Sequence, residues 1–192
     1  MLRFLWLAFV LSVAGCASTP PVVQVQQLNP TVARAFALDG RIAMRYQANA
    51  SSANVHWVHN QVRDEVTLSS PLGSTLAVLT RDAQGVRVVD SDQHVYQGQD
   101  VTELTERLLG VRIPLDYLAY WVLGQAVPNV HFQTEMDATA MLASMQQAGW
   151  KVNYQRWQQS GGYNLPNKLN VVGESGELRM VITQWYINGE GV

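Results

Sequence analysis

Apolar and polar side chains alternate along much of this chain with a period of two residues. In the segment 36–46, for example, Phe36 and Leu38 alternate with Ala37 and Asp39. This period places successive side chains on opposite faces of a β-strand, so we expect one face of the segment to be buried. The same criterion predicts further strands at 55–57, 64–69, 75–81, 86–89, 94–96, 130–133, 169–172 and 178–187.

Two stretches between these strands are harder to assign. Residues 48–52 are small and polar, and we predict that they form the turn between the first two strands. The segment 138–148 begins with residues of high helical propensity, whereas 149–154 alternates as a strand does. We interpret 141–157 as a hairpin, and the sequence leaves the conformation of 138–148 open.

Two short helices are predicted between the strands. Asp100 is placed to cap the first helix, Glu103 completes a capping box, and Gly110 is typical of the residue that follows a helix. The second helix spans about 115–123 and is apolar on nearly every side, with Asp116 as its only charge, so it needs cover on more than one side. Together these elements predict a mainly β fold of the α+β type, in which an antiparallel meander curls into a barrel or half-barrel.

Residues 1–15 are typical of a bacterial lipoprotein signal peptide. Arg3 supplies the positive charge, and the apolar run 4–13 is too short to span a bilayer. The segment ends in Val-Ala-Gly-Cys, which is a lipobox, so we expect Cys16 to carry the lipid. Ala17, rather than an aspartate, follows this cysteine, and that favours the outer membrane over the inner membrane.

The predicted organisation is therefore a signal peptide at 1–15, a lipidated N-terminus and tether at 16–29, and one domain at 30–192. The tether is rich in proline and glutamine and has little that could pack. Cys16 is the only cysteine of the chain, so no disulfide contributes to the fold. Diacylglycerol together with a further acyl chain would hold such a protein stably at a membrane.

Charged residues are scarce. The sequence is 47% hydrophobic and 15% charged, whereas typical soluble domains contain about 25% charged residues. A compact domain of this composition either has a large core or exposes an apolar surface. The formal net charge of −2 and the scattered lysines and arginines give nucleic-acid binding no support.

No catalytic or metal-binding motif stands out. His56 and His59 are an odd number of residues apart, so on one strand they point to opposite faces and cannot share a metal ion. The chain has no Gly-x-Ser-x-Gly elbow, no His-Glu-x-x-His pair and no phosphate-binding loop. We therefore predict a protein that is not an enzyme and that binds no metal or other cofactor.

The turn at 69–75 carries an unusual apolar side chain. Pro71 fixes φ and Gly73 permits a positive φ, so this segment between two strands is predicted to be a tight turn. Leu72 lies between them, at a position where turns usually carry polar residues. Its side chain either folds back under the loop or contacts an apolar surface outside the protein, and the turn alone does not decide between the two.

Tryptophan and methionine are concentrated in the predicted strands and the second helix, at Trp57, Trp121, Trp150, Trp157 and Trp185 and at Met44, Met141, Met145 and Met180. Core packing explains each of these residues alone. On a curved sheet covered by an apolar helix, however, the set also indicates a site for alkyl chains, because methionine adapts to chains of varied shape.

Several motifs resemble the LolB family, the outer-membrane lipoprotein receptors of the LolA/LolB lipoprotein-localization group. In the family's order they are FALDGRIA at 36–43, SPLGST at 70–75, IPL at 113–115 with YWVLG at 120–124, GWKVNY at 149–154 and LPNKL at 165–169. A final strand ending at Trp185 completes the series, so the resemblance covers essentially the whole mature chain. One departure is Asn29-Pro30, which leaves room for only a short helix before the first strand, where family members can have a longer one.

The resemblance implies a single antiparallel sheet curled into an incomplete barrel, with a helical lid over a hydrophobic cavity. Members of the family accept acylated lipoproteins from the soluble periplasmic carrier LolA and release them into the inner leaflet of the outer membrane, without consuming a nucleotide. On this basis Leu72 would be the tip that enters the membrane, and the protein would be a monomer anchored at the periplasmic face of the outer membrane.

We expect acyl chains to be held by Trp57, Leu118, Trp121, Trp150, Met180 and Trp185. The alternative is an outer-membrane lipoprotein that serves as a structural partner in an envelope assembly. Its apolar face would then be buried against protein rather than against lipid.

Overall fold

The computed structural model describes residues 35–47, 49–174 and 176–187. The predicted signal peptide at 1–15 and the predicted lipidated N-terminus and tether at 16–29, with Cys16, lie outside these residues.

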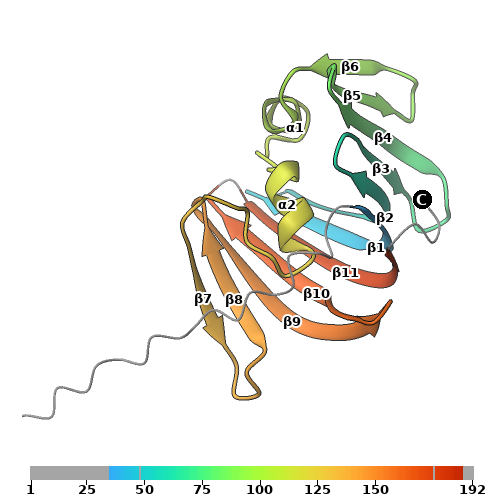
Figure 1. Ribbon diagram of the computed structural model, residues 1–192. Helices are drawn as coiled ribbons and strands as arrows, with labels where there is room; N and C mark the ends of the chain where they lie inside the picture. Colours follow the sequence, from blue (N-terminus) through green and yellow to red (C-terminus); the bar gives the residue numbers. More distant parts are fainter. Residues whose placement is uncertain (1–34, 48, 175, 188–192) are drawn as a thin grey trace, which may run out of the picture.

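One antiparallel sheet of eleven strands dominates the structure (Figure 1). The strands follow the spatial order β6-β5-β4-β3-β2-β1-β11-β10-β9-β8-β7. Their bounds are β1 Ala35–Tyr46, β2 Asn49–Asn60, β3 Asp64–Ser69, β4 Thr75–Asp82, β5 Gly85–Asp90, β6 Val95–Gly98, β7 Phe132–Met136, β8 Leu142–Gln147, β9 Trp150–Ser160, β10 Tyr163–Gly173 and β11 Gly176–Ile187. Strands β6 and β7 form the two edges and do not pair with each other, so the sheet curls without closing into a barrel. The predicted fold class is confirmed.

Two helices, α1 Val101–Leu109 and α2 Leu115–Trp121, connect β6 to β7. Both lie on the concave side of the sheet, between its two ends (Figure 1). The Asp100 carboxylate accepts a hydrogen bond from the backbone N–H of Glu103 at 2.9 Å, and Gly110 ends α1 with a φ of 73°. The predicted start and stop of the first helix are therefore confirmed. The second helix ends slightly earlier than predicted.

The register of the strands places apolar side chains on the concave face. Leu38 on β1 lies opposite Trp57 on β2 and Trp185 on β11, and all three side chains are buried. A bulge at Thr183 of β11 lies opposite the step from Asp39 to Gly40, where a Cβ atom on Gly40 would lie 2.3 Å from the carbonyl oxygen of Val181. Only glycine fits this contact, which pins the register between the first and last strands.

Some strand boundaries differ from the sequence prediction. Residues 49–52 belong to β2, so the predicted turn at 48–52 is wrong, and Gln47 adopts the positive φ of 51° that follows β1. Small and polar residues persist in this part of β2 because both of its faces are open to solvent, so no alternation is required there. Strand β7 begins later and ends later than the predicted 130–133, and β10 extends beyond the predicted 169–172 at both ends.

The hairpin predicted at 141–157 is confirmed as β8 and β9. Its start is fixed by Asp137, whose carboxylate accepts backbone hydrogen bonds from Thr139 at 2.8 Å and Met141 at 3.1 Å. Ala140 takes a φ of 60° in this turn. The side-chain hydrogen bonds of the aspartate thus override the helical propensity of the segment.

Candidate functional site

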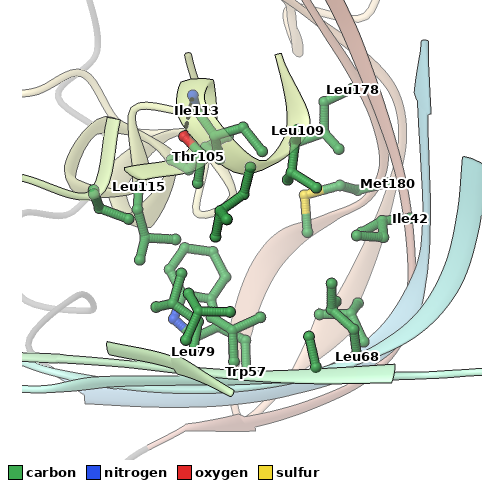
Figure 2. Close-up of a pocket in the computed structure, with 17 residues that line it drawn as sticks. Ile42, Trp57, Leu68, Leu79, Thr105, Leu109, Ile113, Leu115, Leu178 and Met180 are labelled. Atoms are coloured by element: carbon green, nitrogen blue, oxygen red, sulfur yellow. Dashed lines mark hydrogen bonds between the residues drawn. The ribbon is translucent and has the colours of Figure 1, made fainter. Parts of the chain in front are cut away.

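A cavity lies between the concave face of one half of the sheet and the two helices (Figure 2). Its empty volume, including its opening to solvent, is about 870 Å³. The strands contribute Ile42, Val55, Trp57, Val66, Leu68, Ala77, Leu79, Val88, Leu178 and Met180. The helices and the loop between them contribute Val101, Thr105, Leu108, Leu109, Ile113, Leu115 and Leu118.

The floor of the cavity is built from cross-strand rows. Trp57 on β2 lies opposite Val66 on β3, which lies opposite Leu79 on β4, and Leu79 lies opposite Val88 on β5. A second row of smaller extent, Val55, Leu68 and Ala77, lies two residues further along the same strands. Because side chains on one face recur every second residue, these rows form one continuous apolar surface.

The two helices form the roof. Leu115 and Leu118 reach the cavity from α2, and both are buried. Leu109, at the end of α1, lines the cavity and is also 47% exposed, so it marks part of the rim. Figure 2 shows Leu109 on the same side of the cavity as Leu178 and Met180 of β11.

The lining has no polar group free to bind a ligand among the described residues. Thr105 is its only residue with a polar side chain other than Trp57. The Thr105 hydroxyl donates to the carbonyl of Thr102 and accepts from the N–H of Ile113, both at 3.1 Å. The indole N–H of Trp57 donates to Asp64 at 2.8 Å. Such a surface can bury hydrocarbon without leaving a hydrogen-bonding group unsatisfied.

Beside the cavity lies a buried carboxylate, Asp64, which no sequence motif singles out. His59 Nδ1 lies 2.7 Å from its Oδ1, and Arg81 Nε donates to its Oδ2 at 2.7 Å. Burial by itself would raise the pKa of Asp64, but the hydrogen bonds with His59, Trp57 and Arg81 outweigh it, so the pKa lies below its ordinary value. Asp64 is therefore ionised and fully bonded at neutral pH.

Arg81 extends this cluster to the roof. Its guanidinium forms an ion pair with Asp64 beside the cavity and a second ion pair with Asp116 near the start of α2. The first carboxylate is buried and the second is exposed. The arginine thus connects the sheet next to Trp57 to the helix that covers the cavity.

The structure divides the predicted acyl-chain residues into two groups. Trp57, Leu118 and Met180 come together in the lining of the large cavity. Trp121 and Trp185 are buried in the other half of the molecule, and Trp150 lines a small neighbouring space of about 260 Å³.

The indoles of Trp121 and Trp185 are held by hydrogen bonds. Trp121 Nε1 donates to the buried Gln147 side chain at 2.9 Å, and Trp185 Nε1 donates to the carbonyl of Pro166 at 3.0 Å. The hydroxyl of Tyr154 donates to the carbonyl of Trp121 at 3.0 Å. Fixed in this way, the rings fill space rather than enclose it.

Most of the cavity lining consists of aliphatic residues that the sequence analysis did not select. Val66, Leu79 and Val88 look like ordinary core residues in the sequence. The available signal was their position on the inward face of consecutive strands, in the same part of the chain as the turn at 69–75.

The turn between β3 and β4 presents Leu72 to solvent. The side chain is 95% exposed, so it does not fold back under the loop. The N–H of Gly73 donates to the carbonyl of Ser70 at 2.9 Å, and the N–H of Ser70 donates to the carbonyl of Ser74 at 2.8 Å. Asn54 Nδ2 also donates to the carbonyl of Ser70 at 3.1 Å. These bonds hold the turn in one conformation with the leucine at its tip.

Two further observations concern other classes of site. Asp90, Asp92 and His94 bring possible metal ligands within 4.8 Å of one another, but Asp90 already accepts the backbone N–H groups of the other two at 2.9 Å and so shapes their turn. The helices of the described residues include none of the length and apolar character needed to cross a membrane.

Comparisons with known proteins agree on one family. The family described as "Outer membrane lipoprotein LolB" matches residues 34–185. An outer-membrane lipoprotein LolB from Nitrosomonas europaea is 32% identical over 190 residues, which cover 93% of this chain and 90% of the relative. A LolB from Shewanella woodyi is 30% identical over 189 residues, with 95% of this chain and 88% of the relative covered.

Solved structures show the same fold at much lower sequence identity. A LolA superfamily protein from Nitrosomonas europaea superimposes with a TM-score of 0.54 at 7% identity, covering 81% of this chain and 87% of that protein. A DUF1329 family protein from Desulfovibrio piger gives a TM-score of 0.53 at 8% identity, with 85% and 88% covered. The curled, open sheet is therefore a LolA-like fold.

Proposed function

The chain belongs to the LolB family of outer-membrane lipoproteins, and we propose that its cavity receives the acyl chains of lipoproteins delivered by a LolA-type carrier. The family consists of receptors rather than enzymes, and this protein accordingly acts in lipoprotein localization at the outer membrane. The proposal adds the site of binding, the partner that delivers the cargo and the route to the bilayer.

The observation that supports the site is the wholly apolar lining of the cavity beneath α1 and α2. Burying hydrocarbon there is favourable by about 0.8 kcal/mol for each CH₂ group. Trp57, Leu118 and Met180 contact the acyl chains, together with aliphatic neighbours such as Leu79. Transfer from the carrier then needs only tighter acyl binding in the receptor, and release is driven by the much larger apolar volume of the bilayer.

The route to the membrane starts at Leu72. The row formed by Val55, Leu68 and Ala77 extends the cavity along β3 and β4 towards the turn that carries this leucine. An exposed leucine on a rigid turn enters the acyl boundary of a bilayer at little cost. Lipid on Cys16 anchors the protein at the outer membrane through the tether 16–29 and keeps the turn within reach of that surface.

Photo-crosslinking from adjacent residues of β4 tests the cavity. A photoreactive amino acid at position 79 faces the cavity, whereas one at position 78 faces away from it, because neighbouring residues of a strand point to opposite faces. We expect capture of an incoming lipoprotein from position 79 only. Equal capture from both positions, or failure of the protein to bind a fluorescent fatty acid, would contradict the cavity and favour a structural partner in an envelope assembly.

Leu72→Glu tests the tip. We expect the variant to fold, because the side chain is 95% exposed, and to keep its affinity for acylated lipoproteins. Delivery of these lipoproteins into vesicles should fall by at least about tenfold, because a carboxylate resists entry into hydrocarbon. Val62→Glu is the matched control, since Val62 is 76% exposed on the turn at the opposite end of β3. Equal losses in the two variants would argue against the tip.

A further inference from the structure

The outward face of the central strands carries a concentration of positive charge. Residues paired across β1, β11, β10 and β9 include Arg41, Lys168 and Arg156 in one row, and Arg179 lies in the next row towards the turns. Arg45 lies in the row beyond that. The whole chain has a formal net charge of −2, so this concentration is a property of one surface rather than of the composition.

Few negative charges offset these cations. Among the described residues, Arg41, Arg156 and Lys168 have no ion-pair partner. Glu177 pairs with Arg179 at 2.7 Å, and the pKa of its carboxyl lies below the ordinary value because of that bond and the nearby Arg45. This carboxylate is therefore ionised, but it has two arginines as neighbours.

On β1, the anion of this outward face is Asp39. It lies further from the Leu72 end than Arg41, and it is bonded to His56 at 2.7 Å and to the hydroxyl of Tyr186 at 3.1 Å. Its negative charge is thus directed to His56, opposite it on β2, and to Tyr186, which lies one row further from the turn, and not to the arginines nearer the turn.

Arg45 and Arg179 border a shallow hollow that is open to solvent. Its empty volume, open solvent included, is about 520 Å³, and its lining includes the hydroxyl-bearing Ser51 and Ser52 of β2 and the carboxylate of Glu177, which is paired with Arg179. Guanidinium groups hold phosphate oxygens in paired hydrogen bonds, and hydroxyl groups supply further donors. The hollow therefore offers guanidinium and hydroxyl donors to a phosphate-containing headgroup.

This surface lies at the same end of the sheet as Leu72. Ser69, which begins the turn, lies opposite Asn54, and Asn54 lies opposite Arg41. Two strand spacings, about 10 Å, therefore separate Arg41 from the base of the turn. Arg179 and Arg45 lie further along, towards the level that the turn itself reaches.

We propose that Arg41, Arg45 and Arg179 form a docking surface for the phosphate groups of anionic phospholipids, beside the turn that carries Leu72. The leucine enters the bilayer, and the three arginines hold the protein at a fixed tilt against the headgroups. The positive charge of the arginines favours anionic phospholipids as the ligand, because their headgroups lie at the surface that the leucine enters. The inference concerns orientation at the membrane and does not depend on the acyl-chain cavity.

The test uses the full lipidated protein with Ser74→Cys as the site of an environment-sensitive dye next to Leu72. Vesicles of phosphatidylcholine are compared with vesicles in which about one quarter of the lipid is phosphatidylglycerol. We expect the ratio of docked to undocked protein, read from the blue shift of the dye, to rise with phosphatidylglycerol and to fall again at high salt. In Arg41→Gln/Arg45→Gln/Arg179→Gln this rise should shrink by about tenfold or more.

The control variant is Arg63→Gln/Arg87→Gln/Arg112→Gln, which removes the same charge from other surfaces, and thermal unfolding verifies that both variants are folded. The control should retain the response to phosphatidylglycerol. A blue shift that is equal in both vesicle types, or a control that loses as much as the test variant, would overturn the docking surface while leaving the tip intact. Absence of any blue shift in either vesicle would overturn the tip as well.

Discussion

The two halves of the sheet follow the same strand pattern but are filled differently. On the half formed by β1 to β5, aliphatic side chains cover the concave face and leave an open cavity under the helices. On the half formed by β7 to β11, large rings occupy the space instead, including those of Trp121, Tyr154 and Trp185. Branched aliphatic residues line a surface without filling it, whereas aromatic residues fixed by hydrogen bonds fill the volume above a sheet.

The polar groups of the two halves differ in the same way. In the filled half, Gln147 accepts from Trp121 and from the N–H of Val127, both at 2.9 Å, and donates to two backbone carbonyls. In the half with the cavity, the corresponding cluster is ionic: Asp64 and Arg81 link the floor to the roof. The neutral network is buried, whereas the ionic cluster ends at an exposed carboxylate on the helix that covers the cavity.

The largest expected effect is that of Trp121→Ala in the filled half. Removing this fully buried ring, and with it one of the two hydrogen bonds that the Gln147 side-chain oxygen accepts, should lower the free energy of unfolding by about 3–5 kcal/mol. Leu79→Ala in the other half should cost only about 1–2 kcal/mol, because its side chain borders space that is already empty. Urea unfolding measures both values, and similar values would show that the two halves are packed alike.

The next effect is that of Asp64→Asn. Removing a buried charge that bonds His59 and Arg81 should cost about 2–4 kcal/mol, because the guanidinium then loses its buried partner. Asp116→Asn removes the exposed partner of the same arginine and should cost less than about 1 kcal/mol. Equal losses in the free energy of unfolding would show that the buried Asp64 stabilises the cluster no more than the exposed Asp116 does.

Acid should affect the wild type more than Asp64→Asn. The pKa of Asp64 is lowered in the folded state, so its contribution to stability is complete above the unfolded pKa of about 3.9. This stabilising contribution is lost as the pH falls from about 3.9 through the pKa that Asp64 has in the folded protein. The difference in the free energy of unfolding between wild type and variant should therefore narrow below about pH 4. Other carboxylates are shared by the two proteins and cancel, and a constant difference would contradict the lowered pKa.

The smallest effect on stability, and the sharpest comparison, comes from enlarging one residue in each half. Ala77→Phe should fill part of the cavity, changing stability by less than about 1 kcal/mol while weakening the binding of a fluorescent fatty acid by at least about tenfold. Val152→Phe, at a fully buried position, should cost about 1–3 kcal/mol and leave binding unchanged. Calorimetry and fluorescence titration measure these quantities, and the opposite pattern would exchange the roles of the two halves.

The fold could be predicted from the sequence where a local rule decided the structure. Asp100, Glu103 and Gly110 defined the first helix, and the alternation from Phe36 onwards defined β1, because capping and period-two burial are properties of neighbouring residues. The turn at 48–52 was misplaced because an uncovered part of a strand has no alternation to detect. In 138–148, the hydrogen bonds that the Asp137 carboxylate accepts in the turn outweighed the helical propensity of the segment.

The cavity was harder to predict because it is the space that the side chains leave unfilled, and the sequence shows only the side chains themselves. Tryptophan and methionine attracted attention as large side chains, yet Trp121 and Trp185 take up space in the filled half. The lining residues Val66 and Leu79 have the same sequence pattern as a packed core, and only the separation of the helices from the sheet makes them a cavity. That separation depends on long-range packing and on the Arg81 bridge, for which the sequence contains no local signal.

The internal hydrogen bonds of Thr105 have a consequence for fidelity. With that hydroxyl already satisfied, the cavity has no polar contact with which to distinguish one cargo from another. Apolar pockets discriminate weakly, by about 1–3 kcal/mol for a methylene group. Under the acyl-chain proposal above, the cavity would therefore select only weakly among chains, and its lining holds nothing that reads the protein to which a chain is attached.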